Sequence, residues 1–176
     1  MGYKKLVVFV EGHYDKYFFS KIIQPSLTGL YNEIKIKEYA NDDLSKVDNF
    51  LKSLNQMKHS GFDYIFIADM DHCCDYTLKK QKLKNKFKNV DVGSIYLVLK
   101  EIEGWYLSGL DDKNMQKLKF KPRQDCNNII KESFDSSIPN GVTKNDFLSE
   151  VIKVFKINVA KKQSPSFGYL CENLGL

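Results

Sequence analysis

The sequence predicts an α/β protein with a central, mainly parallel sheet of roughly four strands, flanked by helices and followed by a helical C-terminal extension. Short apolar runs, typical of buried parallel strands, alternate with segments of helical periodicity over the first two-thirds of the chain. After residue 110 only helical periodicity returns. We therefore expect an α/β domain over residues 1–110 and a helical extension over residues 111–176, packed on the same domain.

The first strand is expected at residues 5–10, because five consecutive apolar residues end this stretch. The helix that follows carries aromatic and branched residues at helical spacing. Pro25 should end it, because proline lacks the N–H group that a helix interior needs. Ile34 and Ile36 alternate with lysines, which predicts a half-exposed strand at an edge of the sheet.

Four further elements complete the predicted α/β domain. Asn41-Asp42-Asp43 supplies N-cap chemistry for a helix whose apolar residues share one face. Beyond that helix we expect a buried strand at residues 63–68, a lysine-rich helix at roughly 76–88 and a strand at about 94–99.

The predicted extension begins with a polar and basic linker at residues 111–122. Helical periodicity then predicts helices at residues 125–134, 145–157 and 165–174. Pro139-Asn140-Gly141 predicts a turn between the first two of these helices.

The composition suits one domain with a real core, since 43% of the 176 residues are hydrophobic and 13% are aromatic. No apolar run approaches the length of a membrane span, and the N-terminus lacks the layout of a signal peptide, so we expect no membrane partner. The four cysteines show no Cys-x-x-Cys spacing, which favours a reduced, cytoplasmic protein. His72-Cys73-Cys74 suggests zinc, but no second ligand pair lies at suitable spacing.

Two acidic segments each follow a strand-like apolar run. Glu11 comes directly after the first run, and Asp69 and Asp71 follow the run that ends at Ala68. In open α/β sheets ligands bind beyond the carboxyl ends of the strands, so we expect these three carboxylates at one edge of the sheet. Crowded carboxylates repel one another unless a cation neutralises them, and oxygen ligands suit Mg²⁺. The sequence therefore predicts a magnesium site.

The same residues carry a family resemblance. Glu11-Gly12-x-x-Asp15 after the first strand, with Asp69-x-Asp71 after a later one, resembles the Toprim domain of topoisomerases, bacterial primases and nucleases of the overcoming-lysogenization-defect (OLD) family. The segment 100–107 is similar to a stretch that follows the sheet in OLD-like and defence-associated Toprim proteins. The tail around Pro165-Ser166-Phe167 is similar to the ending of small stand-alone Toprim-like families.

The resemblance implies a Toprim-like Rossmannoid fold and a Mg²⁺-dependent nuclease, with Mn²⁺ able to substitute and with Glu11, Asp69 and Asp71 as catalytic residues. Asp15 would either join the metal or cap its own helix, and the sequence leaves both roles open. Glu101 and Glu103 point to different sides of a helix, and the resemblance favours Glu103 as a further metal ligand. The neighbouring Trp105 and Tyr106 are expected in the core.

Lysines supply the predicted nucleic-acid contacts. Six of the ten residues between Lys79 and Lys88 are lysine, a density that suits a polyanion but also suits a solvated helix face. From this segment we assign Lys80, Lys84 and Lys86 to nucleic-acid binding. OLD-like nucleases imply a lysine near the C-terminus, for which Lys144, Lys161 and Lys162 are candidates, and Lys144 and Lys162 complete the assignment.

The preferred function is therefore Mg²⁺-dependent hydrolysis of phosphodiesters in DNA or RNA, including a ribonuclease of the small Toprim kind as a close variant. By resemblance, the protein would act in phage defence with an ATPase, which must be a separate chain because no P-loop motif occurs here. The alternative is a Toprim-like module that binds metal, nucleic acid or a partner without turnover. A nucleotide-sugar transferase that uses Asp-x-Asp is a weaker alternative, because it leaves Glu11-Gly12-x-x-Asp15 unexplained.

Overall fold

The computed structural model describes residues 2–120 and 125–176. The chain divides into two compact units, Met1–Leu97 and Val98–Leu176. The division falls before the predicted boundary at residue 110, and each unit is described by itself. None of the helices among the described residues combines the length and the apolar character that crossing a membrane requires.

The first unit confirms the predicted α/β architecture. Its strands are β1 (Lys5–Val10), β2 (Glu33–Glu38), β3 (Phe62–Asp69) and β4 (Ile95–Val98), which form one parallel sheet in the order β2-β1-β3-β4. Lys5 pairs with Glu33 on one side and with Phe62 on the other, so β1 and β3 lie at the centre. The alternating strand at Ile34 and Ile36 lies at an edge, as predicted.

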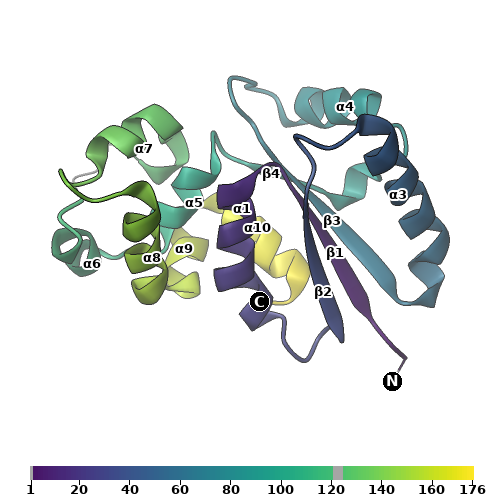
Figure 1. The fold of residues 1–176 in the computed structure, drawn as a ribbon, viewed down its shortest axis with the longest axis horizontal. Coiled ribbons are helices and arrows are strands. Elements are labelled where there is room, and N and C mark those ends of the chain that lie inside the picture. The colour runs from purple at the N-terminus through teal and green to yellow at the C-terminus, as the bar shows by residue number, and fades with distance from the viewer. Residues whose placement is uncertain (1, 121–124) are drawn as a thin grey trace. The chain divides into compact units, whose positions relative to one another are not determined.

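Side chains on both faces of the sheet are buried, because successive residues of a strand point to opposite faces. Val7 and Phe9 of β1 join one apolar cluster with residues of α3 (Leu44–Met57) and α4 (Tyr76–Lys86). Leu6, Val8 and Val10 point to the opposite face and are equally buried. Figure 1 shows α1 (His13–Phe18) on that opposite side of the sheet from α3 and α4.

Pro25 does not end the first helix, contrary to our prediction. The chain stays helical through α1, a π-helical turn at Phe19–Ile23 and α2 (Gln24–Ser26). A proline ring normally clashes with the carbonyl one turn earlier, and a π turn is wider than an α turn. The π turn directly before Pro25 therefore lets the helix continue past it.

Short helical turns join the remaining elements of the first unit. The 3₁₀ turn at Lys58–Ser60 ends at Gly61, whose φ of +83° is left-handed. A Cβ atom there would meet the Tyr3 carbonyl oxygen at 2.3 Å, so glycine is required at this approach to β3. A second 3₁₀ turn at Val92–Ser94 leads directly into β4.

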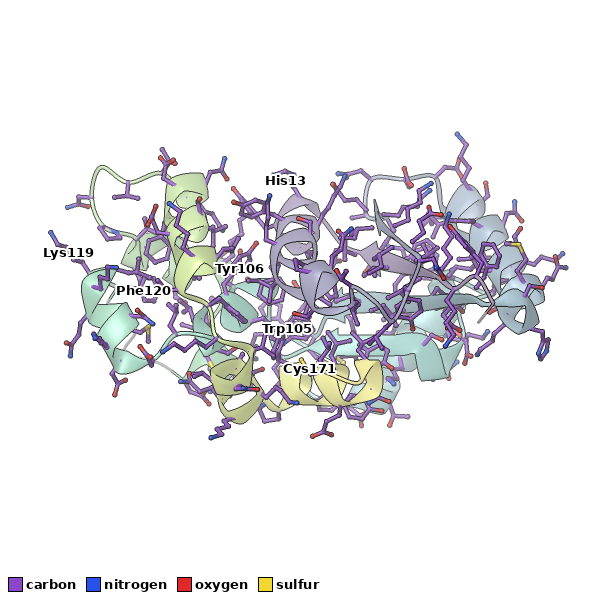
Figure 2. The ribbon with its side chains drawn as sticks, turned by 90° about the horizontal axis from the view of Figure 1, so that it is seen from below. His13, Trp105, Tyr106, Lys119, Phe120 and Cys171 are labelled. Atoms are coloured by element: carbon purple, nitrogen blue, oxygen red, sulfur yellow. The ribbon has the colours of Figure 1, made fainter. Side chains whose placement is uncertain are left out.

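The second unit is helical, as predicted for the C-terminal part of the chain. Its elements are α5 (Ile102–Ser108), α6 (Asp112–Lys117), the 3₁₀ turn Cys126–Asn128, α7 (Lys131–Ser137), α8 (Lys144–Val154), α9 (Ile157–Gln163) and α10 (Pro165–Leu174). Every residue of α5 is buried. The Trp105 indole donates to the Ser166 hydroxyl at 2.9 Å, and its ring packs edge-on against Phe167. Trp105 and Tyr106 are therefore core residues, as predicted (Figure 2).

Three predicted boundaries in this unit are wrong. The expected linker contains α6, which Asp111 caps by accepting the Asn114 N–H, while its last two positions, 121 and 122, lie outside the described residues. The helix expected at 125–134 is a 3₁₀ turn followed by α7. The helix expected at 145–157 ends at Val154, because the Phe155 ring packs where a Gly109 Cβ would lie and the Lys156 N–H donates to the Gly109 carbonyl.

Candidate metal and nucleic-acid site

The carboxyl ends of β1 and β3 place two of the predicted ligands side by side. Glu11 follows the last residue of β1, and Asp69 is the last residue of the adjacent β3. The Asp69 backbone N–H lies 3.4 Å from Oε2 of Glu11 and donates to it. Both residues are half-buried, so their carboxylates lie at the rim of the sheet. The parallel topology therefore brings together residues that are 58 positions apart in the sequence.

Asp71 leaves the strand on a tight turn, which the Cys73 N–H closes by donating to the Met70 carbonyl. Its φ of +49° is left-handed, a conformation that aspartate tolerates better than most residues. The Asp71 carboxylate accepts from the Lys79 ammonium at 2.7 Å. Lys79 lies in the first turns of α4, so this ion pair ties the beginning of α4 to the carboxylate edge.

Asp15 caps its own helix, which is one of its two predicted roles. Its Oδ2 atom accepts the Gly12 N–H at 3.2 Å, and the side chain is buried. Gly12 itself has φ −146° and ψ −167°, an extended conformation that any residue adopts, and a Cβ there would meet nothing closer than 3.8 Å. The fold does not require glycine at this position. His13 projects from the start of α1 into solvent (Figure 2).

Tyr39 lies at the same edge of the parallel sheet as the acidic residues. It follows β2, and its buried hydroxyl donates to the Ile67 carbonyl of β3 at 3.1 Å. Burial raises the pKa of Tyr39 well above its usual value of 10.0, and the charges of four carboxylates raise it further. Those carboxylates are Glu11, Asp15, Asp69 and Asp71. The negative charges that act on this buried hydroxyl come from the ends of β1 and β3 and from the start of α1.

The donor set suits Mg²⁺ in chemistry, because it consists of carboxylate oxygens from adjacent strand ends. Among the described residues, however, no three histidine, cysteine, aspartate or glutamate side chains already stand in a coordinating arrangement. The local hydrogen bonds supply one reason. Asp71 is turned to Lys79 and Asp15 to Gly12, so each carboxylate is neutralised or hydrogen-bonded locally.

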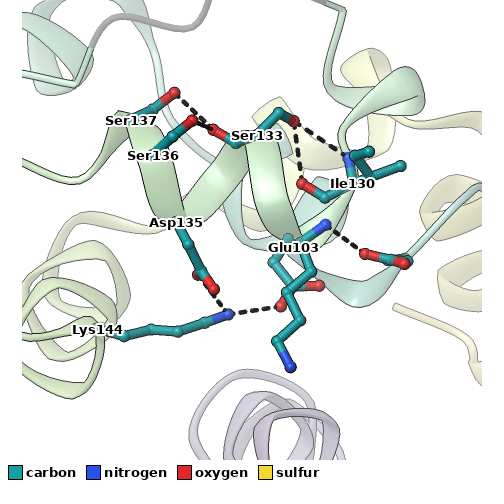
Figure 3. A network of polar contacts seen from close by, with 9 residues as sticks. Glu103, Ile130, Ser133, Asp135, Ser136, Ser137 and Lys144 are labelled. Carbon is teal, nitrogen blue, oxygen red and sulfur yellow. Dashed lines mark hydrogen bonds and ion pairs between the residues drawn. The ribbon is translucent and has the colours of Figure 1, made fainter.

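Glu103 lies in the second unit and is held there by a lysine. The Lys144 ammonium of α8 bridges Glu103 at 2.9 Å and Asp135 at 2.7 Å (Figure 3). The side chain of Glu103 is 5% exposed, so its charge depends on this partner. Burial lowers the pKa of Lys144, but its bonds to Asp135 and Glu103 outweigh burial and leave the pKa above 10.5.

The other candidates in the second unit show three different environments. Glu101, which ranked below Glu103 as a predicted ligand, accepts the Lys131 N–H at the start of α7. Lys161 donates to the carbonyl of the C-terminal Leu176. Lys162, by contrast, is exposed and remains accessible to a ligand.

Most lysines assigned to nucleic acid in α4 also make internal contacts. The Lys84 ammonium donates to the carbonyls of Lys88 and Val90 at 2.7 and 2.8 Å and so closes the end of α4. Lys80 donates to the Val92 carbonyl at 3.3 Å. The exposed Lys86 lies over the Phe87 ring. Lys84 therefore has a structural role, whereas Lys86 keeps its charge at the surface.

All four cysteines are free thiols. Burial raises the pKa of Cys126 and of Cys171 to about 11, so both stay protonated and unreactive near neutral pH. Cys73 and Cys74 bond to nearby backbone carbonyls in the loop after β3. Zinc gains no support, because the described residues contain no group of three suitable ligands.

Two residues at this edge were missed from the sequence. Tyr39 could have been noticed because it directly follows the alternating edge strand, but its reach across β1 to β3 depends on strand order. Lys79 was part of the lysine run, yet nothing in the run singles it out as the partner of Asp71.

Comparisons with protein-family models, with curated proteins and with solved structures return no match for this chain. The resemblance to Toprim domains thus stays a prediction. What the chain does has to be inferred from its own residues and their geometry.

Proposed function

We propose that this protein is a Mg²⁺-dependent nuclease that hydrolyses phosphodiester bonds of DNA or RNA. The observation that carries the proposal is the adjacency of Glu11 and Asp69 at the carboxyl ends of β1 and β3, where the Asp69 N–H donates to the Glu11 carboxylate at 3.4 Å. Carboxylates at adjacent strand ends repel one another in the unliganded protein, and a divalent cation would relieve that repulsion. Their place beyond the carboxyl ends of β1 and β3 is where open α/β sheets bind ligands.

Glu11, Asp69 and Asp71 would hold the ion, with Mn²⁺ able to replace Mg²⁺. When bound, the ion would neutralise charge on phosphate oxygens and increase the acidity of a water molecule. Asp71 would exchange Lys79 for the ion, which frees the ammonium for a phosphate oxygen. In the alternative in which Asp69 and Asp71 alone hold the ion, Glu11 is the residue best placed to accept a proton, because Asp15 is committed to capping α1.

The test is cleavage of plasmid DNA, single-stranded DNA and single-stranded RNA in Mg²⁺ or Mn²⁺, with EDTA as the metal-free control. Asp69→Asn and Asp71→Asn should each lower the cleavage rate by at least about 100-fold, as expected when a group essential to a reaction is removed. Asp63→Asn is the matched control, because Asp63 lies near the opposite end of the same strand. Wild-type cleavage by Asp69→Asn would refute the catalytic assignment.

A second candidate is a module that binds metal or nucleic acid without turnover. The observation that favours it is the Lys79–Asp71 ion pair, which already satisfies one prospective ligand. The same cleavage assay separates the two candidates. A protein that binds nucleic acid but cuts none of the three substrates in either metal would be such a module.

The proposed setting is the cytoplasm, supported by four free thiols that a reducing compartment would preserve. A separate ATPase chain acting with this protein in phage defence is proposed on the Toprim resemblance alone. Co-purification of the tagged protein with an ATPase from its native cell would test that part. An ATPase gene beside its own would support it.

A further inference from the structure

We propose that α4 is a docking surface for single-stranded nucleic acid, on which an unpaired base stacks against Tyr76 beside the carboxylate edge. This inference rests on the proposed function, and it names the strandedness of the substrate.

All charged side chains of α4 are positive. Its eleven residues, Tyr76–Lys86, include five lysines and no acidic residue. A solvated helix face commonly mixes lysine with glutamate, because pairs of opposite charge stabilise the helix and like charges destabilise it. Within the described residues of α4, Leu83 is the one buried side chain, so the helix presents most of its surface to solvent. A polyanion supplies the missing opposite charge.

Apolar side chains lie exposed in the same place. Tyr76 is 48% exposed, Leu78 is 51% exposed, and Val92 is 41% exposed. The Lys80 ammonium bonds to the Val92 carbonyl, so the start of α4 and the turn before β4 adjoin. An exposed aromatic ring with lysines one turn further along the helix offers both contacts that bind single-stranded nucleic acid, because bases stack on rings and phosphates pair with cations.

The position of Tyr76 on the helix is the more specific observation. Tyr76, Lys80, Leu83 and Phe87 follow one another at helical spacing, and the last two are buried in the core. Tyr76 lies on the same face of the helix as the buried Leu83 and Phe87, but nearer the N-terminus of α4, where about half of its side chain is exposed. In the next turn, Lys79 bonds to Asp71 of the carboxylate cluster. A base on Tyr76 would therefore place its own phosphates near Lys79 and Asp71, at the loop that follows β3.

This arrangement favours a single strand over a duplex. Bases inside a duplex stack on each other and offer no face to a protein ring, whereas unpaired bases do. A duplex would meet the lysines alone. Tyr76 should thus increase the affinity for a single strand and have no effect on the affinity for a duplex.

The test measures binding by fluorescence anisotropy, in EDTA so that no cleavage occurs. The two probes are a labelled single strand of about 12 nucleotides, a length within the site sizes of single-strand binding folds, and the corresponding duplex. Tyr76→Ala should weaken single-strand binding roughly 5- to 150-fold, the range for removal of a base-stacking ring, and leave duplex binding within about 2-fold. Tyr76→Phe keeps the ring and should bind like the wild type. Tyr169→Ala is the matched control, because Tyr169 is 56% exposed but lies in α10.

Equal losses of affinity for single strand and duplex, or unchanged affinity in Tyr76→Ala, would overturn the inference. So would failure of the wild-type protein to bind either probe. The binding test and the cleavage test can fail independently of each other. A protein that binds through Tyr76 but cuts nothing would retain this surface and lose the nuclease, whereas one that cuts without needing Tyr76 would do the reverse.

Discussion

At the scale of single residues, Lys144 of the second unit forms one buried ion pair, with Glu103, and one partly exposed ion pair, with Asp135. Glu103 and Lys144 have side chains that are 5% and 13% exposed, while Asp135 lies nearer the solvent. Removing one partner of a buried pair costs more than the pair itself contributes, because the other charge stays buried without compensation. Replacing Lys144 therefore destabilises the protein mainly by leaving the buried Glu103 carboxylate without a counter-charge.

We predict that Lys144→Met lowers the free energy of unfolding by about 3 kcal/mol. Lys153→Met, in the same helix, should cost no more than about 0.5 kcal/mol, because its ion pair with Glu150 lies at the surface. Urea titration followed by circular dichroism measures both. Equal midpoints for the two variants would show that the Glu103 pair contributes little.

The pH dependence gives the same prediction an independent measurement. The folded protein holds the pKa of Lys144 above 10.5, so the stabilisation is fully present below pH 10.5 and is lost as pH rises through the raised pKa. The difference in stability between the wild type and Lys144→Met should therefore stay constant from neutral pH up to pH 10.5 and shrink above it. Tyrosine ionisation affects both proteins alike and cancels. A difference that does not shrink would contradict the raised pKa.

At the scale of elements, the lysines of α4 separate into structural and accessible groups. Lys84 closes the end of the helix on two carbonyls, whereas Lys82 and Lys86 of α4, and Lys88 just beyond it, are exposed. A cation at a helix C-terminus stabilises the helix through hydrogen bonds and the helix dipole. The two groups should consequently respond to substitution in opposite ways.

We predict that Lys84→Met destabilises the protein by about 1–2 kcal/mol and leaves the salt dependence of nucleic-acid binding nearly unchanged. Replacing Lys82, Lys86 and Lys88 by glutamine should leave stability intact. It should also flatten the slope of log K against log salt by up to about 0.7 for each phosphate of a single strand that is no longer neutralised. Thermal melts and anisotropy titrations at several salt concentrations report the two effects. A larger reduction of the slope in Lys84→Met than in the triple variant would reverse this assignment.

The elements also show what the sequence could and could not predict. The apolar runs predicted β1 and β3, and their parallel order was enough to place Glu11 beside Asp69, because parallel strands end at the same edge. The break at Phe155 was not predictable, since it depends on the ring filling the space beside a bare Gly109. Tyr39 was missed for a similar reason, because its hydrogen bond to β3 crosses β1 and no local pattern encodes strand order.

At the scale of the whole molecule, metal binding should raise the free energy of unfolding and the melting temperature. A ligand that binds only the folded state at about 100 times its dissociation constant adds about 2.7 kcal/mol, which corresponds to roughly 5–10 °C in melting temperature for a chain of this size. We predict such a shift for the wild type with Mg²⁺ or Mn²⁺ and its reversal by EDTA.

Asp69→Asn should lose this shift, and its metal-free melting temperature should match or exceed that of the wild type, because the charge beside Glu11 is removed. Asp63→Asn should keep the shift. Differential scanning calorimetry makes both comparisons. If Mg²⁺ raises the melting temperature of Asp69→Asn as much as that of the wild type, the ion binds elsewhere.

The edge strand β2 has a consequence for how copies of this protein behave together. Four of its six residues are charged, and Glu33, Lys37 and Glu38 already form ion pairs with Lys5, Asp42 and Lys16. A strand from another copy that tried to add to this edge would have to displace or bury those charges. The charges thus oppose edge-to-edge pairing of β2 between copies of the protein, so crowding of the copies should not join their sheets at this edge.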